Sequence, residues 1–164
     1  MDALARKVGE RLKAARTMLA TAESCTGGWV AQALTAVPGS SEWFERGFVT
    51  YSNDAKREML GVGADTLARH GAVSEETVRE MALGALASSR ARLSLAVSGV
   101  AGPTGGTPAK PVGTVCLAWA LRDGPLRSET RHYAGDRESI RRQSVLRALE
   151  GVLELLTGDP PGHT

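Results

Sequence analysis

Cysteine and histidine are scarce in this sequence. The 164 residues include two cysteines, Cys25 and Cys116, and three histidines. No CxxC or HExxH spacing occurs among them. Disulfide frameworks and zinc sites are built from such residues at characteristic spacings. The sequence therefore predicts neither a disulfide scaffold nor a metal centre.

Long apolar runs and an excess of one charge are also missing. No apolar stretch approaches the roughly 20 residues that a membrane-spanning helix requires. The segment from Met1 to Arg6 lacks the basic-then-apolar order of a secretory signal, so a cytoplasmic protein that does not contact membranes is expected. Lys and Arg number 20 against 18 Asp and Glu, a formal net charge of +2, which argues against nucleic acid as a partner.

Glycine is the residue in excess, at 19 of 164 positions, against an average near 7%. Apolar periodicity and turn residues predict helices that alternate with strands, followed by a late hairpin. We expect one α/β domain over residues 1–157, a three-layer α/β/α sandwich with a mixed β-sheet, and a flexible tail over residues 158–164. The expected strands cover residues 18–22, 47–51, 93–98, 113–121 and 128–133, and the main expected helices cover residues 4–19, 29–37, 74–86 and 140–156. A short helix that holds Lys56 and Met59 is expected after the capping residues 52–54.

Three polar or glycine-bearing turns follow the ends of expected strands. They run from Ser24 to Gly28, from Tyr51 to Lys56 and from Ser98 to Gly106. In open α/β sheets, ligands bind outside the carboxyl ends of the strands, so these turns are expected to share one crevice. Neither GxGxxG nor GxxxxGK[ST] occurs, which disfavours a Rossmann dinucleotide site and a P-loop.

Within these turns, Ser24 is the candidate nucleophile and Lys56 its candidate base. A serine needs an activating partner, and neither a GxSxG elbow nor a suitable histidine pattern offers a Ser–His–Asp triad. A partly desolvated lysine can lose its proton and accept that of a serine, and Tyr51 is expected to share this proton network. Two alternatives stay open. Ser24 could be only a helix cap and Lys56 only a solvated lysine. Cys25 could be the nucleophile in place of Ser24, or it could be only a small residue of the core.

Backbone N–H groups and one guanidinium are the candidates for anion binding. The segment Thr26–Gly28 opens a helix, where free N–H groups attract an anion and glycine permits close approach, although a plain helix start explains it equally well. The long loop after Ser98 is suited to wrap a nucleotide. Arg137 offers bidentate phosphate contact, whereas Arg141 and Arg142 are expected on a solvated basic face.

Five motifs taken together resemble the CinA C-terminal-domain family. They occur in order between Thr21 and Arg142, and jointly they are highly specific. The motifs are TAESCTGG at 21–28, GFVTYSN at 47–53 with Lys56, GAVS at 71–74, SGVAGP at 98–103 with Gly105 and Gly106, and KPVGTV at 110–115.

The resemblance implies a three-layer α/β/α fold and hydrolysis of the carboxamide of nicotinamide mononucleotide (NMN) to nicotinate mononucleotide and ammonia, in NAD recycling. It implies a mechanism without a metal or other cofactor, in which Ser24 is the nucleophile and Tyr51 and Lys56 activate it. Stand-alone members resemble this chain in length, which favours the enzyme over the longer competence-associated form. The residues expected to bind substrate are Thr26, Gly27, Gly28, Ser98, Gly99, Ala101, Gly102, Gly105, Gly106 and Arg137.

Two other interpretations remain. The glycine loops also suit a non-catalytic nucleotide-binding module, although the joint presence of Ser24, Tyr51 and Lys56 argues against it. A nucleic-acid role, suggested by the family's association with competence, is disfavoured by the weak net charge. The expected partner is a small-molecule substrate, and a homo-oligomer, most simply a C2 dimer, is the prior expectation for quaternary structure.

Overall fold

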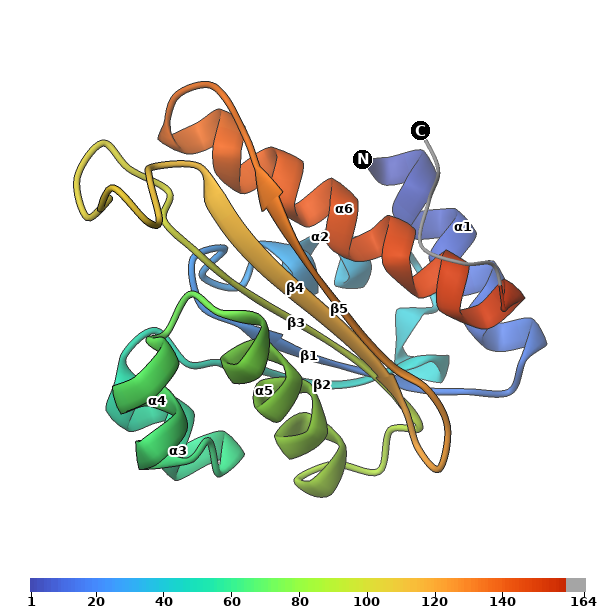
Figure 1. The fold of residues 1–164 in the computed structure, drawn as a ribbon. Helices are drawn as coiled ribbons and strands as arrows, with labels where there is room; N and C mark the ends of the chain where they lie inside the picture. Colours follow the sequence, from blue (N-terminus) through green and yellow to red (C-terminus); the bar gives the residue numbers. More distant parts are fainter. Residues whose placement is uncertain (159–164) are drawn as a thin grey trace.

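Residues 1–158 are described by a computed structural model, and they fold into a sheet with helices on both faces (Figure 1). The strands are β1 (Leu19–Glu23), β2 (Phe44–Val49), β3 (Leu93–Gly99), β4 (Thr114–Leu121) and β5 (Leu126–His132). The helices are α1 (Asp2–Ala14), α2 (Trp29–Thr35), the short 3-10 helix η1 (Ser40–Glu42), α3 (Asn53–Leu60), α4 (Ala64–His70), α5 (Glu75–Ala87) and α6 (Arg137–Thr157). Apart from Gly158, the expected tail lies outside the described residues.

The sheet is mixed, as expected. Its five strands lie in the order β2-β1-β3-β4-β5. β1 pairs in parallel with β2 and β3, whereas β4 is antiparallel to both β3 and β5. The three central strands are buried along almost their whole length, while β2 and β5 form half-exposed edges.

Two helical layers bury the two faces of the sheet. Helices α1, α2 and α6 cover one face, and α3, α4 and α5 cover the other (Figure 1). Large aliphatic side chains such as Leu12, Leu34 and Leu149 fill the first layer, whereas alanines and Met81 dominate the second. The predicted three-layer α/β/α sandwich is therefore confirmed. No helix within residues 1–158 combines the length and the apolarity needed to cross a bilayer.

Helix starts follow the capping residues that the sequence offers, with one helix missed. Ser52 accepts a hydrogen bond from the third residue of α3, and Ser74 accepts one from the third residue of α5. Helix α4 was not expected, because its seven residues contain only one apolar side chain that packs on the core, Leu67. Its start is fixed by a distant contact instead, since Glu80 accepts the N–H of Gly63.

Candidate active site

The carboxyl ends of β1, β2 and β3 lie side by side, and the turns that follow them meet there. Glu23 at the end of β1 pairs with Val49 of β2 and with Val97 of β3. The chain continues these ladders for one more residue, because the Ser24 N–H donates to the Val97 carbonyl at 3.0 Å and the Thr50 N–H donates to the Glu23 carbonyl at 2.8 Å. Ser24 is thus fixed between its two neighbouring strands.

Ser24 and Lys56 are in direct contact. The Lys56 Nζ donates to the Ser24 Oγ at 3.1 Å and to the Thr50 carbonyl at 2.9 Å, and it lies 3.5 Å from the Tyr51 carbonyl. Lys56 is 1% exposed and Ser24 is 7% exposed. The first turn of α3, capped by Ser52, carries the lysine into this position. The fold therefore brings together the pair that the sequence could only propose.

Burial weakens the charged form of Lys56. Burial lowers the pKa of the Lys56 ammonium from its ordinary value of 10.5, and the negative charge of an ionised Cys25 would oppose this shift. The three oxygens that accept hydrogen bonds from the Nζ atom are uncharged, so none of these contacts is an ion pair. A neutral amine that touches a serine hydroxyl can accept its proton.

Cys25 is a poor alternative nucleophile. Its side chain belongs to the core beneath α6, and burial raises the pKa of the thiol to about 12. The thiolate is the reactive form of cysteine, so a thiol with such a pKa stays protonated and inert at neutral pH. The geometry therefore favours Ser24 over its neighbour.

Two charged residues that sequence reasoning missed hold the Ser24 turn, defined here as residues 24–28. The buried Glu23 carboxylate accepts the Thr26 hydroxyl at 2.6 Å and the first free N–H groups of α2, those of Val30 and Ala31, at 2.8 and 3.1 Å. On the other side, Arg141 Nε donates to the Cys25 carbonyl at 3.0 Å and its Nη2 donates to the Thr26 carbonyl at 3.1 Å.

These contacts correct one expectation and leave a second in place. Arg141 is half-buried and bonded to the turn rather than solvated, whereas Arg142 is exposed as expected. An acidic residue just before a helix start was a usable signal for Glu23, because carboxylates are stabilised at helix N-termini. No local signal pointed to Arg141, which lies 116 residues from Cys25 in the sequence.

A pocket of about 320 Å³ opens above Ser24 and Lys56. Among the residues expected to bind substrate, Ser98, Gly99, Ala101, Gly102, Gly105 and Arg137 line it, together with Tyr51 and the unexpected Ala72, Val73, Val100 and Thr104. The expected Thr26, Gly27, Gly28 and Gly106 do not line it. Gly27 and Gly28 instead adopt φ values of 60° and 106°, which let the turn pass from β1 into α2.

Arg137 and Tyr51 meet at the mouth of this pocket. The Arg137 Nη1 donates to the Gly102 carbonyl at 2.8 Å, and its Nη2 donates to the Tyr51 hydroxyl at 3.2 Å. The Tyr51 side chain is 62% exposed, and within residues 1–158 no hydrogen bond joins its hydroxyl to Ser24 or Lys56. The structure thus places the predicted third catalytic group beside the predicted phosphate ligand.

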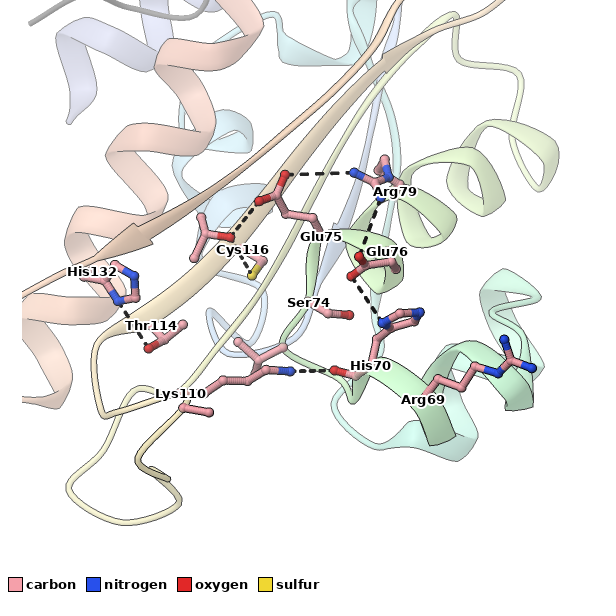
Figure 2. A pocket seen from close by; sticks show the side chains of 13 residues that line it. Arg69, His70, Ser74, Glu75, Glu76, Arg79, Lys110, Thr114, Cys116 and His132 are labelled. Carbon is pink, nitrogen blue, oxygen red and sulfur yellow. Dashed lines mark hydrogen bonds and ion pairs between the residues drawn. The ribbon is translucent and has the colours of Figure 1, made fainter.

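A larger pocket of about 620 Å³ lies at the start of α5, where it shares Val73 with the first (Figure 2). Its charged groups are largely paired with one another. Glu75 accepts hydrogen bonds from two hydroxyls of β5, and the Lys110 Nζ donates to the His70 carbonyl at 2.5 Å. Cys116 is its only nucleophilic thiol among the lining residues, and burial raises the pKa of that thiol. The smaller pocket is the one that holds the Ser24–Lys56 pair.

Metal ligands are not grouped in the described part of the chain. Between residues 1 and 158, no cluster of three or more His, Cys, Asp and Glu side chains is arranged to hold a metal ion. The groups positioned at the pocket for reaction are a hydroxyl and an amine.

Comparison with known proteins places the sequence in a family. A family model described as the CinA C-terminal domain matches residues 1–156. The chain is 56% identical to nicotinamide-nucleotide amidohydrolase PncC of Pseudomonas putida, covering 94% of this chain and 96% of that protein. It is 54% identical to the PncC protein of Escherichia coli K12, covering 90% and 89% of the two chains.

The solved structures agree with the sequence relatives. The crystal structure of the competence/damage inducible protein CihA from Agrobacterium tumefaciens superposes with a TM-score of 0.92 at 49% identity, over 95% of this chain and 94% of that chain. A family model spanning nearly all of the sequence, together with relatives that match over nearly their full length, identifies the group. The chain belongs to the CinA C-terminal domain family.

Proposed function

We propose that this protein hydrolyses the carboxamide of NMN to nicotinate mononucleotide and ammonia, a step of pyridine-nucleotide recycling. One observation carries the proposal: a serine hydroxyl and a buried lysine amine, 3.1 Å apart, at the floor of a pocket. The printed names of the relatives supply the substrate class. Amide hydrolysis needs a nucleophile and a base in contact, and this pair meets that requirement.

Lys56 moves the protons in the first half of the reaction. The neutral Nζ accepts the Ser24 proton as the Oγ bonds to the carboxamide carbon and the carbonyl π electrons move to oxygen. When the tetrahedral intermediate collapses, the C–N bond breaks and the Lys56 ammonium returns its proton to the departing nitrogen, which leaves as ammonia. A nicotinate ester of Ser24 remains.

The second half repeats these roles, with water as the nucleophile. Water attacks the ester carbon while the neutral Lys56 amine accepts a proton from the water. Collapse breaks the bond between carbon and the Ser24 Oγ, and the Lys56 ammonium protonates the serine. The acid product leaves as nicotinate mononucleotide, and the enzyme returns to its starting protonation state. One residue thus acts as base and then as acid in each half.

Arg137 is the proposed anchor for the phosphate. It is exposed at the pocket mouth, and its guanidinium already donates to two neutral oxygens there. A phosphate dianion is a stronger acceptor than a carbonyl or a phenol, so substrate is expected to replace one of these contacts. The loop residues that line the pocket, Ser98 to Gly102 with Gly105, would then surround the ribose.

The test is ammonia release from NMN by the purified protein, with nicotinate mononucleotide measured by chromatography. We expect Ser24→Ala to lower kcat by at least about a thousandfold while NMN still binds, because the nucleophile is lost. Cys25→Ala is the neighbouring comparison, and we expect it to lose less than about tenfold. An inactive Cys25 variant beside an active Ser24 variant would move the nucleophile, and NMN binding without turnover in the wild type would favour the non-catalytic module.

A further inference from the structure

The Ser24 turn has an N–H group at the pocket, that of Cys25, which donates to no other residue in the described part of the chain. The Cys25 side chain is buried and the residue lines the pocket. Within residues 1–158 no other residue accepts its N–H, whose hydrogen bond is to the thiol of Cys25 itself. The N–H groups of Thr26 and Gly28 also lack an acceptor within those residues, whereas the Ser24 N–H donates to the Val97 carbonyl and the Gly27 N–H donates to the Ser24 carbonyl, each at 3.0 Å. Buried backbone donors are almost always paired, so a donor at a pocket wall that no other residue accepts is available to a ligand atom.

We propose that the Cys25 N–H donates to the oxyanion of the tetrahedral intermediate, and that Arg141 is the positioning residue that holds it there. The assignment rests on the proposed amide hydrolysis. Thr26 is fully buried and does not line the pocket, which leaves Cys25 as the donor of this turn. The residue directly after a nucleophile is a suitable donor, because its N–H moves with the attacking atom.

Peptide geometry explains how Arg141 acts. In a trans peptide, the C=O and N–H bonds point in opposite directions. The Ser24 carbonyl is held by the Gly27 N–H, so the N–H of the same peptide group, that of Cys25, points the other way. Arg141 fixes the next two carbonyls, those of Cys25 and Thr26, and so prevents the first peptide group from rotating.

The chain offers a matched control beside Arg141. Both Arg141 and Arg142 place their guanidinium carbon 5.5 Å from the centre of the Trp29 ring. Only Arg141 donates to the turn, because Arg142 lies 4.0 Å from Glu138 on the exposed side of α6. The two arginines thus share their charge and their aromatic neighbour, and they differ in contact with the turn.

The experiment compares Arg141→Met with Arg142→Met. Methionine keeps an apolar stem over Trp29 and removes the donors. We expect Arg141→Met to lower kcat for NMN by about tenfold to hundredfold with KM changed by less than about threefold, since an oxyanion donor acts in the transition state. The pH midpoint of kcat should stay constant, because Lys56 keeps its surroundings. Arg142→Met should match the wild type.

A substrate-independent readout separates this proposal from the proposed function. Ser24 labelling by a fluorophosphonate, in which the Oγ bonds to phosphorus and fluoride leaves, needs the same oxyanion donor and is measured by intact mass. It should slow in Arg141→Met by a factor similar to that for kcat. If the wild type releases no ammonia from NMN, the proposed function fails, and the labelling ratio still decides the role of the turn.

Several results would overturn the positioning role. One is an unchanged kcat and labelling rate in Arg141→Met, and another is a change in KM without a change in kcat. An equal loss of kcat in Arg142→Met would also overturn it, as would a shifted pH midpoint of kcat, which would place the effect on Lys56. Should Arg141→Met fail to fold by circular dichroism, Arg141→Lys replaces it. Lysine keeps the charge but cannot hold both carbonyls in one plane, so the same kcat-specific loss is expected at smaller size.

Discussion

At the scale of single residues, the proposed mechanism depends on the protonation state of Lys56. A base must be neutral to accept a proton, and burial lowers the pKa of this lysine from 10.5. We therefore expect kcat/KM to rise with pH through the lowered pKa and then to level off. Activity that falls as pH rises over this range would contradict the assignment of Lys56 as base.

Lys56→Arg separates charge from basicity. Arginine keeps a positive charge but does not lose its proton at working pH, so it cannot take the proton of Ser24. We expect kcat to fall by at least about a hundredfold, close to the loss in Lys56→Ala, because a positioned base contributes on the order of 10²–10⁴ to rate. Steady-state ammonia release measures both, and an arginine variant near wild-type turnover would show that charge alone suffices.

Tyr51→Phe tests whether the tyrosine acts in proton transfer or in binding. Its hydroxyl contacts Arg137 and not the Ser24–Lys56 pair, so the geometry favours a binding role. We expect KM for NMN to rise several-fold with kcat reduced by less than about threefold. A hundredfold loss of kcat at constant KM would instead support the proton relay that the sequence predicts.

At the scale of elements, the strand ends explain what could be predicted from sequence. Apolar runs with turns behind them located β1, β2 and β3, and the rule for strand ends then grouped Ser24, Lys56 and the Ser98 loop. The contacts of Glu23 and Arg141 with the turn depend on how α2 and α6 pack against the sheet. The local sequence pattern carries no information about that packing. For the same reason, the pairing of Tyr51 with Arg137, 86 residues apart, could not be foreseen.

The start of α6 and the loop after β3 meet at Arg137, the proposed phosphate ligand. Arg137→Ala removes the guanidinium that spans from Gly102 to Tyr51. A charge-assisted contact is worth about 1.5–3 kcal/mol, so we expect kcat/KM for NMN to fall about tenfold to hundredfold. Nicotinamide riboside, which lacks the phosphate, should lose much less.

Measuring kcat/KM for NMN and for nicotinamide riboside in the wild type and in Arg137→Ala gives a double-mutant cycle. If Arg137 binds the phosphate, the loss is larger for NMN than for the riboside. Equal losses for NMN and the riboside would show that Arg137 orders the loop and Tyr51 rather than binding phosphate. The phosphate would then need another anchor among the residues that line the pocket.

At the scale of the whole molecule, two separate hydrophobic cores support the candidate site. Each helical layer buries its own face of the sheet, and the site lies where the carboxyl ends of the parallel strands leave both layers. The antiparallel strands β4 and β5 widen the sheet beyond β3. Helix α6 then brings Arg137 to the Gly102 carbonyl and Arg141 to the Ser24 turn. A C2 dimer stays a prediction, which light scattering of the purified protein tests.

The buried lysine should also weaken the fold in a pH-dependent way. Between the lowered pKa of folded Lys56 and 10.5, its ordinary value, the unfolded chain binds more protons than the folded chain. The free energy of unfolding therefore rises with pH across that window, and the cost of the buried amine is largest below it. Lys56→Met removes the titrating group, so the stability of the wild type relative to this variant should increase from pH 7 to pH 10.5.

Denaturant unfolding at several pH values measures this difference, with Lys7→Met, at an exposed position on α1, controlling for the loss of one positive charge. The sign is independent of how much packing or hydrogen bonding the methionine loses, because those losses do not titrate. A wild type that loses stability relative to Lys56→Met as pH rises would mean that Lys56 is held as an ammonium. The same result would remove the neutral amine from the proposed mechanism, since a lysine stabilised in its charged form cannot take the proton of Ser24 at neutral pH.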